Sequence, residues 1–231
     1  MDQGTPRDAG NWAQPVERLH VVGSGPRANL EGKRIAGPQQ GFGRMWERTF
    51  TIPIGDAATP EALVKSWRED FGSFWPKGGT FYGPLTAIKP GDVAPLEAGI
   101  PTGILVLYAD DTSFSFLTPE GHFINGMITF SAERVSARGT VAQITMLIRM
   151  SDPVWEMAWP IVKSAESRFW PGTLMNLAAA HGVADATVTE RTTIVDPNRQ
   201  WRRWTNVIHN GVPAAAAAKI GAALRRRRMA P

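Results

Sequence analysis

Hydrophobic positions alternate with polar or small ones along the middle of the chain, most clearly between residues 140 and 150. In that stretch every second side chain is apolar: Ala142, Ile144, Met146, Ile148 and Met150. A period of two is typical of a β-strand that turns one face toward a core. Shorter stretches before it have the same character. The pattern therefore predicts several consecutive strands, at residues 103–108, 113–118, 125–132 and 140–150.

A long helical segment is predicted directly after these strands. Ser151-Asp152-Pro153 places capping side chains before a proline at the first helical position. Pro160 and Pro171 should each kink or restart the helix, because proline removes an internal donor and clashes with the preceding turn. Gly182 is expected to end it. One apolar stripe is expected to face the sheet, formed by Trp155, Trp159, Val162, Phe169, Leu174 and Leu177.

The first part of the chain predicts one more strand and one more helix. Residues 43–54 alternate less regularly and are interpreted as the first strand. Thr59-Pro60-Glu61 has the features of a helix start, and the apolar residues after it recur at helical spacing. Residues 80–88 are interpreted as a further strand. Residues 89–101 hold three Pro and two Gly and are expected to form a loop, as a lid or rim.

These elements predict an α+β fold, with a curved antiparallel sheet gripping a long C-terminal helix. The expected organisation is a flexible N-terminal extension over 1–40 and a helix-grip domain over 41–182. It continues with a strap or added edge strand over 183–212 and an Ala-rich, Arg-terminated tail over 213–231. An architecture of this kind is commonly used to enclose a ligand between the sheet and the helix.

Composition favours one aromatic-rich core. Hydrophobic residues make up 43% of the 231 positions, and nine Trp and ten Phe occur with only two Tyr. Such bulk either fills an interior or lines an apolar pocket. There is no cysteine, which excludes disulfides and thiolate metal sites. Because no signal-peptide layout and no long apolar run occur, we expect a soluble, cytoplasmic protein rather than an integral membrane protein.

The high pI of about 9.8 comes from the end of the chain. Residues 201–231 contain seven Lys or Arg and no Asp or Glu, while the preceding 200 residues carry 18 basic and 21 acidic side chains. The domain itself is therefore slightly acidic, and a polyanion-binding face on it is not indicated. The Arg225–Arg228 run could contact anionic lipid or nucleic acid, but such a tail is more often a solubilising extension.

Familiar catalytic and cofactor motifs are absent from the chain. Glu120 and His122 do not form a metal site, since only four His occur and none pair at ligand spacing. We expect no metal and no cofactor, and name no catalytic residue. Gln143 and Arg149 fall on the more polar face of their strand and are expected to be solvated.

The residues from Thr118 to Phe130 resemble a family motif, Thr-Leu-Pro-Gly-His-Pro-Glu-x-Gly-Glu-x-x-Phe. Five positions match it: Thr118, Gly121, His122, Gly126 and Phe130. The motif belongs to an uncharacterised domain family of the START-like (SRPBCC, polyketide cyclase) helix-grip superfamily. Ile124 and Met127 stand where that pattern has two glutamates, and Glu120 and Phe123 replace its two prolines. The resemblance covers roughly residues 103–180 and implies a deep apolar cavity between sheet and helix, with no agreed catalytic residues.

The leading functional hypothesis is binding of a hydrophobic small molecule or lipid-like ligand between the sheet and the helix. His122 would be a polar anchor at the cavity mouth, although a histidine that only holds the turn is the more common situation. An alternative is a cyclase- or hydrolase-like enzyme using His122 and Tyr108 as acid–base groups. A third is an interaction protein tethered by its tail to anionic surfaces. The residues expected to line the ligand site are Tyr108, Phe116, His122, Ile128, Phe130, Met146 and Trp159.

Overall fold

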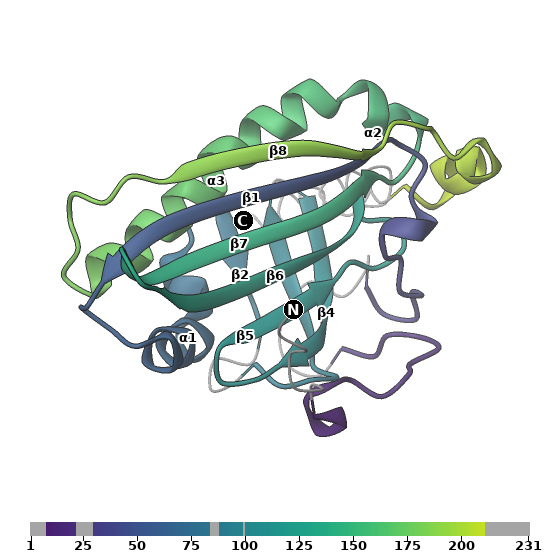
Figure 1. The fold of residues 1–231 in the computed structure, drawn as a ribbon. Coiled ribbons are helices and arrows are strands. Elements are labelled where there is room, and N and C mark those ends of the chain that lie inside the picture. The colour runs from purple at the N-terminus through teal and green to yellow at the C-terminus, as the bar shows by residue number, and fades with distance from the viewer. Residues whose placement is uncertain (1–7, 22–29, 84–87, 99, 211–231) are drawn as a thin grey trace, which may run out of the picture.

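An antiparallel sheet of eight strands forms the frame of the computed structural model, which describes residues 8–21, 30–83, 88–98 and 100–210 (Figure 1). The strand order is β2-β3-β4-β5-β6-β7-β1-β8. The sheet is curved, and its concave face is the apolar one. The strands are β1 (Met45–Gly55), β2 (Gly79–Phe81), β3 (Val93–Ala98), β4 (Ile100–Ala109), β5 (Ser113–Leu117), β6 (Ile124–Val135), β7 (Gly139–Met150) and β8 (Thr189–Asp196).

Helices cover the concave face from two directions. The long helix α3 (Trp159–Ala180) packs over β1 and β7, while α1 (Pro60–Glu69) and the short helix η3 (Phe71–Phe74) pack at the other end (Figure 1). The short helix α2 (Pro153–Met157) leads from β7 into α3. This arrangement confirms the predicted α+β class, in which a curved antiparallel sheet grips a long helix. No helix of the described residues is long and apolar enough to cross a membrane.

The predicted helix boundaries agree well with the structure. Asp152 caps α2 by accepting from the backbone N–H groups of Val154 and Trp155. The helix restarts at Trp159 with Pro160 in its first turn, as expected, but it runs on through Pro171. After α3, Gly182 adopts a φ of +80°, and the Val183 N–H donates to the Ala178 carbonyl, which closes the helix end.

Two predictions about the segment after η3 were wrong. Residues 89–101 are not a loop, because β3 occupies Val93–Ala98 and pairs with both β2 and β4. Proline is tolerated at position 95 because the three residues of β2 pair with Leu96, Glu97 and Ala98, so the missing N–H of Pro95 breaks no pair with β2. The Pro95 carbonyl still accepts a hydrogen bond from the Tyr82 N–H. The strand predicted over 80–88 ends at Phe81, and residues 84–87 lie outside the described part.

The described parts of residues 1–40 pack on the convex face of the sheet, where a flexible extension had been expected. Leu19 and Leu30 are fully buried there in a second, small apolar cluster with Val93 and Leu105. Gly103 makes this packing possible, since a Cβ on it would lie 2.4 Å from a Leu30 methyl group. The described parts of this segment therefore pack on the sheet through Leu19 and Leu30.

The segment after α3 forms both an added edge strand and a strap. β8 pairs antiparallel with the outer edge of β1, and the short helix η4 (Trp201–His209) then crosses to the α2 end of the sheet (Figure 1). Arg149 of β7 holds this return. Its guanidinium donates to the carbonyls of Gly43 (2.5 Å) and Asn198 (2.9 Å) and pairs with the Asp196 carboxylate.

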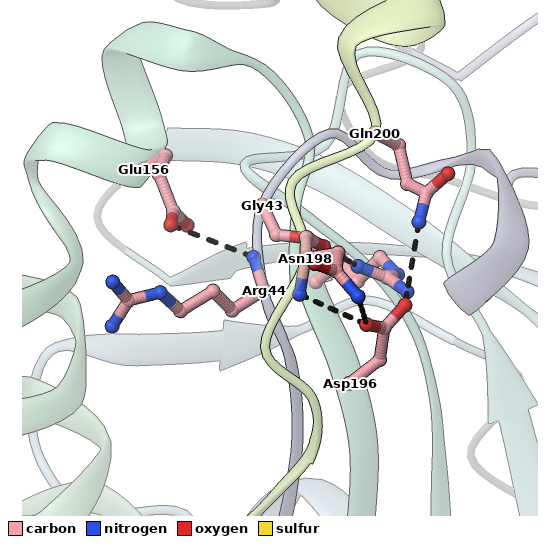
Figure 2. Close-up of polar contacts among 7 residues, drawn as sticks. Gly43, Arg44, Glu156, Asp196, Asn198 and Gln200 are labelled. Atoms are coloured by element: carbon pink, nitrogen blue, oxygen red, sulfur yellow. Dashed lines mark hydrogen bonds and ion pairs between the residues drawn. The ribbon is translucent and has the colours of Figure 1, made fainter.

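Figure 2 shows the groups around this carboxylate. Asp196 accepts from the backbone and side-chain amides of Asn198 and from the Gln200 amide, while the Glu156 carboxylate of α2 accepts from the Arg44 N–H. Arg149 is only 1% exposed, so the expectation that it is solvated was wrong. It is buried because the chain before β1, at Gly41 and Gly43, and the chain that leaves β8, at Asp196 and Asn198, pack around it.

We predict that Arg149→Ala lowers the free energy of unfolding by about 2–4 kcal/mol, because it removes a buried cation that serves three acceptors. Arg191→Ala is the matched control. Arg191 lies exposed on β8, and its loss should change stability by no more than about 0.5 kcal/mol. Denaturant unfolding of both variants tests this, and equal small effects would show that Arg149 does not hold the strap.

Candidate functional site: the concave interior

The concave face is built from rows of side chains that cross β6, β7 and β1. The registers place Gly126 beside Ile148 and Trp46 in one row. The next row holds Ile128, Met146 and Arg48, and the one after it Phe130, Ile144 and Phe50. The face therefore changes along the strands, from a row with a glycine, through a row with a buried cation, to a row with two phenylalanines.

The end of the interior near α1 is filled by aromatic rings. Phe71 of η3 is the centre of this cluster, with edge-on contacts at 5.0–5.7 Å to Phe81, Phe114, Phe116 and Phe130. Phe114 and Phe130 stack at 4.8 Å, and Trp67 adds an edge contact to each. Rings packed this tightly stabilise the core, so we place no ligand at this end.

The opposite end, beneath α2 and the start of α3, is less completely closed. A set of apolar side chains there packs against the core but stays partly exposed; we call it the interior patch: Trp46, Phe123, Ile128, Trp155 and Trp159. Trp46 and Trp159 stack at 5.0 Å, and Phe123 and Trp155 lie 5.5 Å apart. Gly126 contributes no side chain, and Ile148 leans over it. A Cβ on Gly126 would lie 2.6 Å from Ile148, so Ile148 fills that position, and the partial exposure belongs to the five residues of the interior patch.

Buried indole donors without a partner in the described part of the chain occur in this patch, as they do at Trp67, Trp75 and Trp170 elsewhere in the core. The Nε1 groups of Trp46 and Trp155 are buried and have no hydrogen-bond partner among the described residues. A buried donor without a partner carries a desolvation cost of about 1–3 kcal/mol. Both groups could satisfy that requirement by donating to an acceptor oxygen placed against the patch.

A buried arginine ties the patch to the helix above it. Arg48 is fully buried, and its Nη1 donates to Glu166 of α3 at 2.5 Å. Its Nη2 donates to Ser167 at 2.6 Å and to Glu190 of β8 at 2.7 Å. The guanidinium carbon also lies 5.9 Å from the ring centre of Trp159. One cation thus joins β1, α3 and β8 beside the interior patch.

The two carboxylates that share Arg48 differ in their pKa. Burial raises the pKa of Glu166 to about 7, against the attraction of Arg48, and the nearby Glu190 carboxylate adds to the rise. Burial also opposes ionisation of Glu190, but hydrogen bonds from Arg48 and Ser167 hold its pKa below the usual value. Because Glu190 is the more exposed of the two, it is the carboxylate that balances the Arg48 charge at neutral pH.

The structure brings five of the predicted lining residues together on the interior side. Ile128, Phe130 and Met146 lie on neighbouring positions of β6 and β7, and Phe116 pairs with Ile128 from β5. Trp159 of α3 packs at Trp46 and Arg48 of β1, and Arg48 pairs with Met146. Phe116, Phe130 and Met146 are almost completely buried. Ile128 and Trp159 belong to the interior patch and are the ones that remain partly exposed.

Tyr108 and His122 do not lie with that group. Tyr108 pairs with Ser115, packs on Trp12 of the N-terminal segment at 4.7 Å, and donates to Asp110 at 2.5 Å. Its position in the register places it on the convex face. It also lies near the start of β5, whereas His122 follows the end of that strand. An acid–base pair acting on one substrate atom is therefore not possible for these two residues.

His122 holds the turn between β5 and β6. Its Nδ1 accepts from the Ile124 N–H at 3.0 Å, and its ring stacks on Phe123 at 4.4 Å. Burial lowers the pKa of His122 to about 4, although the hydrogen bond from Ile124 acts in the other direction. The ring is therefore neutral at physiological pH, and it touches the interior patch through Phe123.

Sequence reasoning missed the polar part of the site, although the signals were present. Arg48 stands in a strand between Trp46 and Phe50, where a period of two assigns it to the buried face. Glu166 lies four residues from both Val162 and Trp170, in the middle of the stripe that α3 buries. A cation and an acid at apolar positions indicate a buried pair. Within the described ranges, no cluster of His, Asp or Glu could hold a metal ion.

Comparisons with known proteins found similar solved structures, but no matching family model and no matching curated protein. The solved structures that resemble it include the protein NE0264 from Nitrosomonas europaea, with 12% identity, a TM-score of 0.43, and coverage of 58% of this chain and 92% of that one. A protein from Thermobifida fusca has 16% identity and a TM-score of 0.43 over 61% and 95% of the two chains. Ara h 8.0201 has 14% identity and a TM-score of 0.39 over 58% and 97%. We therefore base the helix-grip assignment on the strand order and the position of α3.

We predict that Glu166→Gln changes stability in a pH-dependent way. Folding raises the pKa of Glu166 from 4.5 to about 7, so its contribution to stability falls as the pH rises through that interval. Gln cannot ionise. We subtract the free energy of unfolding of the wild type from that of the variant. This difference should be about 2 kcal/mol larger at about pH 8 than at about pH 5. Denaturant unfolding at both pH values measures this difference; if it stays constant, Glu166 is ionised throughout.

Proposed function

We propose that this protein binds an apolar small molecule between the sheet and the start of α3, against the interior patch. The observation that carries the proposal is the partial exposure of Ile128 on β6 and Trp159 on α3. Ile128 shares a row with Met146 and Arg48, and the Trp159 ring lies 5.9 Å from the Arg48 guanidinium carbon. In a well-filled core such side chains are covered by protein. Their uncovered apolar surface is the surface that a hydrophobic ligand would bury.

The same region suggests the polarity of the ligand. Trp46 and Trp155 offer buried N–H donors that have no partner among the described residues. The site therefore favours a largely apolar molecule that carries at least one acceptor oxygen, such as a carbonyl, ester or carboxyl group. Arg48 is occupied by Glu166, Ser167 and Glu190, so it would orient the patch rather than bind the ligand.

The other two hypotheses have less support. The enzyme hypothesis assigned acid–base roles to His122 and Tyr108, and these two residues lie apart and are engaged in local hydrogen bonds. The Arg225–Arg228 tail lies outside the described residues, so a tether role for it remains a prediction from the sequence. Neither hypothesis accounts for the apolar side chains of the interior that are left partly exposed.

The test is a titration with the fluorescent apolar probe N-phenyl-1-naphthylamine. Ile128→Trp adds an indole to the open part of β6 and should weaken probe binding about tenfold or more, because it fills the proposed volume. Met127→Trp is the matched control, since Met127 is the neighbouring residue on the opposite face of β6. It should bind the probe as the wild type does.

A second variant keeps the test decisive if Ile128→Trp folds poorly. Trp159→Ala removes the wall of the patch that α3 contributes, and it should also weaken probe binding. Circular dichroism and thermal unfolding establish that each variant is folded. Wild-type protein that does not bind the probe, or folded Ile128 and Trp159 variants that bind it unchanged, would contradict the proposal.

A further inference from the structure

Large apolar side chains are exposed to solvent on the outer side of α2, α3 and η4. Met157 is 77% exposed and Ile161 74%, and with Val154 they recur at a spacing of three and four residues along one side of α2 and α3. On η4, Trp201 is 69%, Trp204 58% and Ile208 76% exposed. Contiguous exposed apolar groups of this size mark interaction surfaces in proteins.

The two sets of side chains lie on adjoining elements. α2 and η4 pack against each other, and Asn206 of η4 donates to the Ser151 carbonyl just before α2. Arg199, which precedes η4, donates to Glu156 of α2 at 3.0 Å. Figure 1 shows η4 beside α2 at the same end of the sheet. We call these six residues the outer apolar surface: Val154, Met157, Ile161, Trp201, Trp204 and Ile208.

The exposed arginines of η4 carry positive charge, and the acid of α2, Glu156, is paired with Arg199. Arg202 and Arg203 alternate with the tryptophans of η4 in the sequence Trp201-Arg202-Arg203-Trp204, and both are exposed without an ion-pair partner among the described residues. From residue 201 to the end of the chain there are seven Lys or Arg and no Asp or Glu. Tryptophan interleaved with arginine is suited to the boundary between lipid headgroups and acyl chains.

A polar recess lies directly beneath η4. It has a volume of about 150 Å³ and is lined by Arg203 and His209 of η4, by Arg34 of the N-terminal segment, and by Glu120 and Asn125 beside the turn from β5 to β6. Asn125 is 3% exposed, and its side-chain oxygen has no partner among the described residues. Arg34 and Arg203 are the lining groups suited to the phosphate of a lipid headgroup. Glu120, which lies 3.7 Å from His209, and the acceptor oxygen of Asn125 are not.

We propose that the outer apolar surface docks onto the surface of an anionic phospholipid bilayer. Trp201, Trp204 and Ile208 would insert at the headgroup level together with Met157 and Ile161, while Arg202 and Arg203 contact lipid phosphates. The proposal goes beyond the binding of an apolar ligand and does not depend on it. The proposed ligand site and the proposed membrane-binding surface would lie on opposite sides of the same helices. Trp155 and Trp159 of α2 and α3 point inward, while Met157 and Ile161 point outward.

The experiment is co-sedimentation of the full chain with vesicles of equal parts phosphatidylcholine and phosphatidylglycerol, compared with pure phosphatidylcholine. We expect binding to the anionic vesicles that weakens with added salt. Met157→Ser combined with Ile161→Ser should weaken it about tenfold or more, because each residue loses apolar area buried in the lipid. Trp201→Ser combined with Trp204→Ser should act similarly, although Trp201 also packs on Phe42 and its loss can affect folding.

Two control variants test whether the vesicles bind this surface in particular. Met175→Ser removes an apolar side chain that is 50% exposed elsewhere on α3, and Arg138→Ala removes an exposed charge from the far end of β7; both should bind as the wild type does. Deleting residues 211–231 should leave part of the binding in place. Any of these results would overturn the proposal: binding lost entirely with that deletion, a folded Met157/Ile161 variant that binds fully, or concentration-dependent self-association of the chain in place of vesicle binding. Preferential binding to RNA that the apolar variants leave unchanged would do so as well.

Discussion

The position of α3 over the sheet depends on one buried cation. Arg48 cannot be desolvated without compensating charge and hydrogen bonds: Glu190 of β8 balances its charge, and Glu166 and Ser167 of α3 accept hydrogen bonds from it. The helix α3 and the strand β8, which lie far from β1 in the sequence, must therefore both approach β1 at Arg48. This contact fixes where the first half of α3 crosses the sheet, and with it the place where Trp159 packs on Trp46.

The two ends of the concave face have different roles because their side chains differ in size. Toward α1, Phe71 and the stacked pair Phe114 and Phe130 fill the interior. Toward α2, β6 presents Gly126 and Ile128, and the covering tryptophans remain partly exposed. The first end stabilises the fold, and the second leaves apolar surface available. An additional strand and a strap after α3 then protect the outer edge of β1, with Arg149 holding the chain where it returns.

Local patterns allowed much of the fold to be predicted. The strong alternation of β7 and the cap-and-proline start of α2 were sufficient to place the sheet and the long helix. The strand β3 was missed because Pro90, Pro95 and Pro101 indicated a loop, while the pairing that overrides them comes from β2 and β4. The interior-facing positions on β5, β6 and β7 followed from alternation, but the position of Tyr108 did not, because β4 is irregular between Val106 and Tyr108. The buried partners of Arg48 and Arg149 come from elements more than 40 residues away, and spacing along the chain carries no information about them.

The most direct test of the central claim is native mass spectrometry of the chain purified gently from the cells that naturally produce it. The account predicts a bound apolar molecule in a ratio of one per chain, which is released on denaturation and is absent from the folded Ile128→Trp variant prepared in the same way. A chain that is recovered at its bare mass, and that takes up no apolar molecule from a total lipid extract of those cells, would contradict the account. In that case the interior would be a core only, and the exposed residues of α2 and η4 would be the remaining functional surface.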